Sequence, residues 1–251
     1  MTAARHATRV NALADALAAS APLHLRDAAQ LLGVSEMTIR RDIEKVPDRF
    51  GYLGGYIVPR AGDAPYVMAQ EQGAHEAAKA AIAGRAAALI EADDTVFIDC
   101  GTTTPHLVRA LPDRPMTVVC YALNVAAPLA ARPNVRLILL GGLYNPSSAS
   151  FAVEDGLATL ARLGINKAFL SAGGVHAERG VSCSNFHEVA VKQAVLRLSE
   201  RRCLLVDGSK LGKLRPAFFA GLDGFDTLIT NEGAGLSALR PAFSGTIITD
   251  R

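Results

Sequence analysis

Seven short apolar runs beyond residue 75 constrain the fold of this chain more than any other feature of its sequence. The runs are "TVFID", "MTVVCY", "VRLILLGG", "KAFLSAGG", "CLLVDGSK", "DTLITN" and "TIIT". Stretches with helical periodicity separate them, and this alternation is typical of a parallel β-sheet covered by helices. The sequence therefore predicts an α/β domain over residues 76–251.

Small or polar residues follow the first five of these runs. The stretches concerned are "DCGTTT", "YALN", "GGLYN", "SAGGV" and "DGSK". In open α/β sheets, ligands bind in the crevice outside the carboxyl ends of the strands. We therefore expect the five stretches to converge on one ligand site.

The stretch after the first run suits a phosphate or a carboxylate. Gly101 permits a tight turn, and the threonine hydroxyls and the backbone N–H groups that follow it can all donate hydrogen bonds. Lys210, in "DGSK", can supply a cation from another strand end. An ordinary strand-to-helix turn with a threonine cap is the alternative.

The other candidate ligand-binding residues also have two interpretations. The pairs Gly141-Gly142 and Gly173-Gly174 let the backbone approach a ligand or only serve turns. Asn124 binds a ligand hydroxyl or caps the next helix. Glu188 and Lys192 stand four residues apart on a predicted helix, where an exposed ion pair is the simplest interpretation and a position facing the crevice is the alternative. The candidate ligand-binding residues are Asp99, Gly101, Thr102, Thr103, Thr104, Asn124, Gly141, Gly142, Gly174 and Lys210.

Catalysis has weaker support. A sugar-phosphate isomerase needs a positioned base, and Asp99 and Asp207 are the carboxylates near strand ends. The six histidines form no metal-ligand or triad pattern, and no serine occupies a nucleophile elbow. The four cysteines form no C-x-x-C pair and are expected to be reduced and inert. We expect no catalytic residue, metal or cofactor; an isomerase-like enzyme with an appended helical domain is the alternative.

Residues 1–58 show three helical stretches and a hairpin. Apolar periodicity predicts a helix that includes Val10 and Leu17, then a helix that ends at a left-handed Gly33, then one that Ser35 caps. Short β-prone pieces on either side of Gly54-Gly55 predict a two-residue hairpin turn. Elements in this order form a winged helix-turn-helix.

The third of these helices, "EMTIRRDIEKV", can read DNA. Ile39, Ile43 and Val46 form its inward stripe, so the remaining side chains are available to base edges and phosphates. The net charge of +2 belongs wholly to the first 60 residues, which hold eight Lys and Arg against six Asp and Glu. A solvated amphipathic helix is the alternative. The candidate DNA-binding residues are Ser35, Met37, Thr38, Arg40, Arg41 and Lys45.

Residues 59–75 are rich in Pro, Gly and Ala and show no periodicity, which predicts a linker between the two domains. No apolar run reaches the roughly 18 residues that a membrane span needs. The N-terminal "MTAARHATRV" has no apolar core of the kind that a signal peptide carries. We therefore expect a cytoplasmic protein without a membrane partner.

Taken together, the motifs resemble those of the DeoR family of bacterial repressors. "LHLRDAAQLLGVSEMTIRRDIE" resembles the helix-turn-helix signature of the family, and "DCGTTT", "LGGLY", "SAGGVH" and "VDGSKLGK" resemble successive motifs of its sensor domain. The motifs stand in the family's order along nearly the whole chain. The resemblance implies a sensor fold similar to ribose-5-phosphate isomerase and coenzyme A transferases, kept for binding without the chemistry.

The resemblance also implies a function. It implies a repressor that binds operator DNA through the helix from Ser35 to Val46 and is released by a phosphorylated sugar, with deoxyribose 5-phosphate as the expected effector of a deoxyribonucleoside or sugar catabolic operon. The phosphate would lie on residues 101–104, with Lys210 nearby. A homo-oligomer is expected, because one small module with few basic residues binds DNA weakly and linked modules gain from effective concentration.

The wing departs from the family's pattern. Most members carry a basic residue just before the wing glycines, whereas this chain has Gly51-Tyr52-Leu53 before Gly54-Gly55. The resemblance therefore assigns no DNA contact to the wing.

Overall fold

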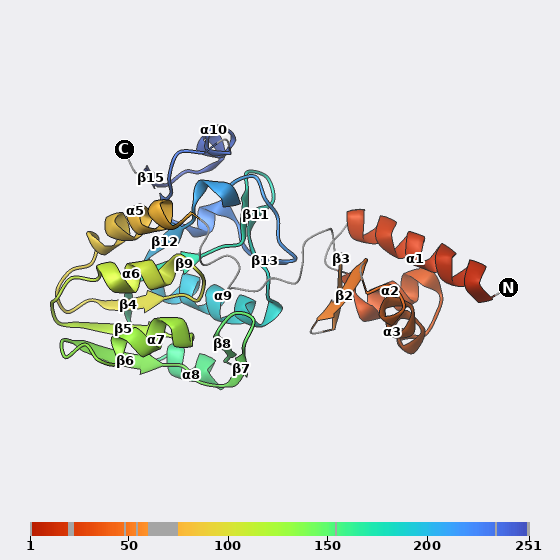
Figure 1. Ribbon diagram of the computed structural model, residues 1–251, viewed down its shortest axis with the longest axis horizontal. Coiled ribbons are helices and arrows are strands. Elements are labelled where there is room, and N and C mark those ends of the chain that lie inside the picture. The colour runs from red at the N-terminus through yellow and green to blue at the C-terminus, as the bar shows by residue number, and fades with distance from the viewer. Residues whose placement is uncertain are drawn as a thin grey trace. The chain divides into compact units, whose positions relative to one another are not determined.

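The computed structural model describes residues 2–19, 23–47, 49–53, 55–59, 75–153, 155–233 and 235–249. The chain forms two compact units, Met1–Pro65 and Tyr66–Arg251 (Figure 1). The predicted linker, residues 59–75, lies outside the described residues except at its two ends. Its boundaries stay a prediction.

Helices packed on a small antiparallel sheet make up the N-terminal unit. The helices are α1 (Thr2–Ala19), α2 (Leu25–Leu32) and α3 (Glu36–Glu44), and the strands are β1 (Leu23–His24), β2 (Phe50–Leu53) and β3 (Tyr56–Pro59). The sheet has the order β1-β3-β2. Leu13, Leu25, Ile39 and Ile57 belong to one buried cluster, so every helix of the unit contributes its apolar stripe to the same core.

The turn between α2 and α3 has the predicted geometry. Gly33 adopts a left-handed conformation with φ of 62°, and its N–H bonds the carbonyls of Ala29 and Gln30 at the end of α2. Ser35 caps α3, and its side chain accepts a hydrogen bond from the Thr38 N–H at 3.2 Å. The helix-turn-helix predicted from the sequence is confirmed.

The wing hairpin is confirmed as well, although Gly54 lies outside the described residues. Leu53 pairs with Tyr56, which leaves a two-residue turn, and Gly55 has φ of 91°. The sequence did not predict β1, in which Leu23 pairs with Ile57. A two-residue strand carries no periodicity and forms only because β3 offers it a free edge.

A seven-stranded parallel sheet forms the centre of the C-terminal unit in the described part of the chain, with the order β15-β14-β12-β9-β4-β5-β6. The strands are β4 (Thr95–Ile98), β5 (Met116–Cys120), β6 (Val135–Leu139), β9 (Ile165–Ser171), β12 (Ser199–Leu205), β14 (Thr227–Ile229) and β15 (Thr246–Ile248). Each of the seven apolar runs forms one of them. The predicted α/β fold is therefore confirmed.

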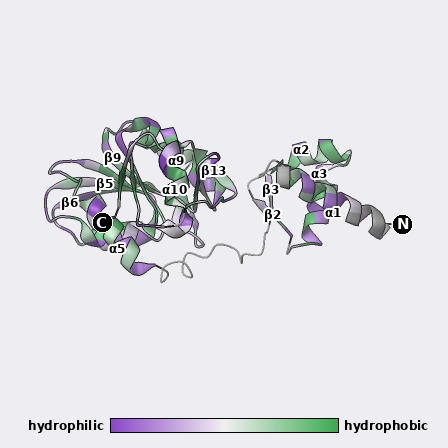
Figure 2. Cartoon of the chain, turned by 90° about the horizontal axis from the view of Figure 1, so that it is seen from above, coloured by the Kyte–Doolittle hydropathy of each residue, from purple (hydrophilic) through white to green (hydrophobic). Residues whose placement is uncertain are grey.

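Helices cover this sheet and bury its strands. They are α5 (Glu76–Ala87), α6 (Thr104–Ala110), α7 (Leu123–Leu129), α8 (Gly156–Leu160), α9 (Val189–Leu198) and α10 (Leu236–Leu239). Right-handed crossovers place α6 and α7 on one face and α9 on the other, because the chain moves through the sheet in one direction from β4 to β6 and in the opposite direction after β6. Figure 2 shows hydrophobic strands β5 and β9 in the middle of the unit.

The strand order reverses between β4 and β9. The chain runs from β4 outward to β5 and β6, then returns to the other side of β4 and continues through β9, β12, β14 and β15. The connections that leave the carboxyl ends of β4 and β9 therefore diverge to opposite faces. This divergence opens a crevice at the topological switch point of the sheet.

Small antiparallel sheets surround this edge. One contains β10 (Gly174–His176), β11 (Gly180–Cys183) and β13 (Ala217–Ala220), and β7 (Leu143–Asn145) pairs with β8 (Ser150–Ala152). Short 3-10 helices lie at Phe186–Glu188 (η1), Gly208–Lys210 (η2), Leu222–Gly224 (η3) and Arg240–Ala242 (η4). Among the described residues, no helix is both long and apolar enough to cross a membrane.

Candidate functional site

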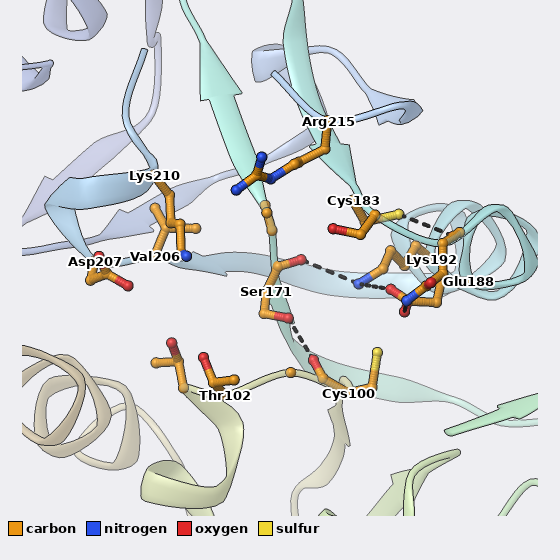
Figure 3. A pocket seen from close by; sticks show the side chains of 16 residues that line it. Cys100, Thr102, Ser171, Cys183, Glu188, Lys192, Val206, Asp207, Lys210 and Arg215 are labelled. Atoms are coloured by element: carbon orange, nitrogen blue, oxygen red, sulfur yellow. Dashed lines mark hydrogen bonds and ion pairs between the residues drawn. The ribbon is translucent and has the colours of Figure 1, made fainter. Parts of the chain in front are cut away.

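A polar pocket lies at the switch point (Figure 3). Its walls come from the carboxyl ends of three strands: Cys100–Thr103 after β4, Ser171–Gly173 after β9, and Val206, Asp207 and Lys210 after β12. The lining is completed by Cys183–Asn185 at the end of β11 and by Glu188, Lys192 and Arg215. The pocket thus joins segments that are more than a hundred positions apart in the sequence.

Two of the five predicted strand ends do not reach this pocket. Asn124, which follows β5, donates a hydrogen bond from Nδ2 to the Gly101 carbonyl at 3.0 Å and so supports the loop that lines the pocket. Gly141 and Gly142 follow β6 at the edge of the sheet and are exposed. The expectation of full convergence is wrong for these two ends, because β5 and β6 lie on the far side of β4 from the switch point.

Gly101 has no substitute at its position. Its φ of 131° is one that side-chain-bearing residues rarely adopt, and a Cβ there would lie 2.4 Å from Ser171 Oγ. The tight turn places Thr102 and Thr103 in the pocket wall, with 8% and 4% of their surface exposed. Thr104 begins α6, is fully buried and donates from Oγ1 to the Gly101 carbonyl at 3.5 Å.

The other predicted glycines allow close approaches of the backbone. A Cβ on Gly142 would lie 1.9 Å from the Ala152 carbonyl oxygen, and one on Gly174 would lie 2.5 Å from that of Lys213. Both glycines therefore admit a neighbouring strand or loop at close range. Gly173, which lines the pocket, leaves room for Arg215, since a Cβ there would lie 2.8 Å from Arg215 Cγ.

Two cations line the pocket from the same side. Lys210 ends η2, which Asp207 caps by accepting a hydrogen bond from the Ser209 N–H at 3.0 Å. Figure 3 shows Lys210 and Arg215 across the pocket from Thr102. Sequence reasoning found Lys210 and missed Arg215, although Arg215 stands only five residues after Lys210 in the sequence. The backbone N–H of Arg215 donates to Ser182 Oγ at 2.9 Å, which fixes the origin of its side chain.

Beneath the pocket lies a buried hydrogen-bonded network around Asp99. The carboxylate, fully buried, accepts hydrogen bonds from the Tyr121 hydroxyl at 2.8 Å and from the Ser171 N–H at 2.8 Å. Lys192 Nζ donates to the same carboxylate and to the Ser171 carbonyl at 3.2 Å. Asp99 is therefore placed as a support of the pocket floor and is absent from the pocket lining.

Glu188 and Lys192 do not form the exposed ion pair that was the simplest interpretation of the sequence; they face the crevice, which was the alternative. Only 5% of Glu188 and 1% of Lys192 is exposed, and both line the pocket. Glu188 Oε2 lies 3.5 Å from Lys192 Nζ, and Glu188 Oε1 accepts a hydrogen bond from Asn185 Nδ2 at 2.8 Å. The helical spacing was read correctly, but the packing of α9 against β9 and β13 turns this face inward.

Burial and charge fix the protonation of several groups here. Burial disfavours the ammonium form of Lys192, but the Asp99 carboxylate outweighs it, so the pKa of Lys192 is raised well above its ordinary value. Burial likewise raises the pKa of the Cys100 and Cys183 thiols. Lys192 is thus a cation and both thiols are neutral at physiological pH. All four cysteines are unpaired and buried, and the described residues contain no cluster that could hold a metal ion.

In the N-terminal unit, α3 presents a mostly polar outer face. Ser35, Arg41 and Lys45 are exposed, 59% of Met37 is exposed, and Thr38 is half-buried. Arg40 is exposed but oriented toward the wing: it donates to the Tyr52 hydroxyl at 2.9 Å, and its guanidinium carbon lies 4.9 Å from the ring centroid. The wing residue Tyr52 thus holds an arginine of α3.

An acidic residue ties the inner face of α3 to α1. Asp42, 4% exposed, accepts hydrogen bonds from Arg9 Nε at 2.6 Å and pairs with His6 Nδ1 at 2.8 Å. Sequence reasoning missed this residue because an aspartate that directly follows two arginines appears solvated. The tie fixes how α3 projects its outer face.

Two family descriptions match the chain. The DeoR-like helix-turn-helix domain matches residues 9–50, and the DeoR C terminal sensor domain matches residues 74–232. The chain belongs to the DeoR family. The pocket at the switch point lies within the sensor domain, and α2 and α3 are the helix-turn-helix.

Relatives of this DeoR-family chain match it over most of their own length. The deoxyribose operon repressor of Escherichia coli strain K12 is 41% identical over 230 residues, which are 90% of this chain and 91% of that protein. The HTH-type transcriptional regulator IolR of Bacillus subtilis strain 168 is 30% identical over 229 residues, with 89% and 90% covered. The chain is therefore a transcriptional regulator, and the enzyme alternative is set aside.

The fold is also similar to a solved enzyme structure. Ribose 5-phosphate isomerase A from Neisseria gonorrhoeae matches with a TM-score of 0.39 and 16% identity, over 53% of this chain and 52% of the isomerase chain.

Proposed function

We propose that this DeoR-family regulator represses an operon of deoxyribonucleoside or related sugar catabolism, and that a phosphorylated sugar in the pocket releases it from operator DNA. Deoxyribose 5-phosphate is the effector we propose. The relative named deoxyribose operon repressor, at 41% identity over 90% of this chain, supports the choice of operon. The observation that supports a sugar phosphate as the effector is the polar pocket at the switch point.

The phosphate end of the pocket comprises Thr102, Thr103, Lys210 and Arg215. After the turn at Gly101, the threonine hydroxyls and the N–H groups at the start of α6 can donate to phosphate oxygens. Lys210 and Arg215 add charge-assisted hydrogen bonds, which are about twice as strong as neutral ones. Asn124 and the Asp99 network hold this end in place through Gly101 and Ser171.

The proposed DNA-binding surface is the outer face of α3. We propose that Ser35, Met37, Thr38, Arg40, Arg41 and Lys45 contact the operator, with the arginines on guanine edges or phosphates. Effector binding releases the operator only if the effector has unequal affinity for the DNA-bound and free forms. We propose a homo-oligomer, because paired recognition helices on two half-sites bind far more tightly than one.

Effector release tests this function directly. We expect the full chain to bind a fluorescent duplex carrying its operator, and deoxyribose 5-phosphate to lower the anisotropy while inorganic phosphate at the same concentration does not. The Lys210→Met variant should bind the same duplex normally and lose its response to the sugar phosphate.

Lys213→Met is the matched control, because Lys213 has the same charge, is exposed and is absent from the pocket lining. It should respond like the unmodified chain. A Lys210→Met protein that is released at the same effector concentration would show that the phosphate binds elsewhere.

A further inference from the structure

The pocket has two chemically different ends. Lys210, Arg215 and Thr102 lie at one end, and Glu188 and Lys192 lie at the other (Figure 3). Asn185 is hydrogen-bonded to Glu188. We infer that the Glu188 carboxylate accepts hydrogen bonds from hydroxyl groups of the effector and thereby selects neutral sugar phosphates over phosphorylated sugar acids. This inference rests on the proposed sugar-phosphate function and names the ligand chemistry of the second end.

The charge balance at this end is negative. Lys192 brings one positive charge, and it is bonded to the buried Asp99 carboxylate and to the Ser171 carbonyl. Glu188 stands farther from it, with 3.5 Å between Oε2 and Nζ. One ammonium thus faces two carboxylates, so a third carboxylate from a ligand would meet net repulsion in a buried place, where charge interactions are strong.

Glu188 also has hydrogen-bonding capacity left. An ionised carboxylate offers about four acceptor positions. Asn185 Nδ2 uses one on Oε1 and Lys192 approaches Oε2. The remaining lone pairs belong to a carboxylate that lines the pocket with 5% of its surface exposed. Hydroxyl groups are the donors that a sugar phosphate brings to this end.

The position of Glu188 is set before any ligand arrives. Glu188 ends the short helix η1 and directly precedes α9, and Asn185, one residue before η1, holds Oε1 at 2.8 Å. A buried acceptor that is already oriented loses little entropy when a hydroxyl binds, and it penalises a ligand that brings no donor. Glu188 is therefore suited to discriminate between ligands that share the same phosphate.

Two ligands that differ at one carbon test this inference. Ribose 5-phosphate and 5-phosphoribonate share the phosphate and the intervening hydroxyls, and only the latter has a carboxylate at the first carbon. In isothermal titration of the full chain, we expect the unmodified protein to bind ribose 5-phosphate and deoxyribose 5-phosphate at least about tenfold more tightly than 5-phosphoribonate.

The Glu188→Gln variant keeps the shape and an acceptor for Asn185 but removes the charge. It should bind both sugar phosphates about tenfold or more weakly, narrow the preference over 5-phosphoribonate and leave the affinity for inorganic phosphate unchanged. Lys210→Met should weaken all four ligands. Thermal unfolding without ligand shows whether either variant is folded.

The inference would be overturned if Glu188→Gln bound the sugar phosphates with unchanged affinity and kept the same ratio of affinities for ribose 5-phosphate and 5-phosphoribonate. Glu188 would then be only a counter-ion of Lys192. Should that variant fail to fold, the unmodified protein still decides, because equal or tighter binding of 5-phosphoribonate overturns the inference. If no sugar phosphate binds the unmodified protein at all, the proposed function itself has failed.

Discussion

The geometry of the pocket depends on the absence of a side chain at Gly101. Its φ of 131° and the Ser171 hydroxyl, 2.4 Å from where a Cβ would stand, both exclude an alanine without rearrangement. Ser171 cannot move away freely, because its Oγ donates to the Cys100 carbonyl at 2.5 Å and its N–H to Asp99.

We therefore expect Gly101→Ala to destabilise the protein by about 1–3 kcal/mol and to abolish the effector response, because the turn that carries Thr102 and Thr103 must shift. Chemical denaturation and effector titration measure the two effects. Gly141→Ala is the control, since a Cβ there meets no heavy atom within 4 Å. A Gly101→Ala protein with normal stability and response would remove the turn from the mechanism.

Single residues also show where sequence reasoning ends. Gly33 and Ser35 were predictable, because a left-handed helix end and an N-cap need particular residue types at particular positions. The burial of Glu188 and Lys192 was not, since i, i+4 spacing is the same on an exposed and a buried helix face. Arg215 was missed because its place depends on the path of a loop after β12, which no periodicity encodes.

At the scale of elements, the orientation of α3 depends on its tie to α1. Asp42 is the charged group in that tie. Burial alone would raise its pKa, but hydrogen bonds from Arg9 and His6 outweigh burial and hold the pKa below its ordinary 3.8. A carboxyl whose pKa is lower in the folded state stabilises the fold at pH values above its unfolded pKa.

We therefore expect α1 and α3 to lose stability as the pH falls below 3.8, through the folded pKa of Asp42. Hydrogen-exchange protection of peptides from the two helices, measured in the full chain between about pH 5 and pH 2.5, should fall over that window. The Asp42→Asn variant should show lower protection at neutral pH and a flatter pH dependence. Equal slopes for both proteins would mean that another group controls the acid transition.

The main elements of the fold could be predicted because their signals are local. Each of the seven sheet strands is an apolar run in the sequence, and parallel strands buried on both faces give such runs. β10, β11 and β13 were not predicted, since they are short and held by tertiary pairing. Strand order was not predicted either, so the sequence could not tell that the ends of β5 and β6 miss the switch point.

At the scale of the whole molecule, the proposed mechanism couples two binding events in separate units. Thermodynamic linkage requires the coupling to be reciprocal: if deoxyribose 5-phosphate weakens operator binding by some factor, operator DNA must weaken deoxyribose 5-phosphate binding by the same factor. We expect that factor to be about 5- to 150-fold, the usual range of allosteric coupling.

Calorimetric titration of the sugar phosphate into the free chain and into its complex with a saturating operator duplex measures this factor. This factor should equal the factor by which the sugar phosphate changes the affinity for the operator, because the two binding steps form one thermodynamic cycle. A non-operator duplex of the same length is the control. Release of the operator without any change in effector affinity would mean that the sugar phosphate acts on the DNA or on aggregation of the chain, and not through the pocket.

The spread of the pocket along the chain has a consequence for its synthesis. The helix-turn-helix core closes within the first 57 residues, from Val10 to Ile57, whereas the pocket needs segments from Cys100 to Arg215. A ribosome, which builds the chain from its N-terminus, has made the first unit long before it adds the last pocket residue. Each newly made chain therefore passes through a period in which its helix-turn-helix sequence is complete and its effector pocket is not, so that control by an effector can begin only after Arg215 has been added.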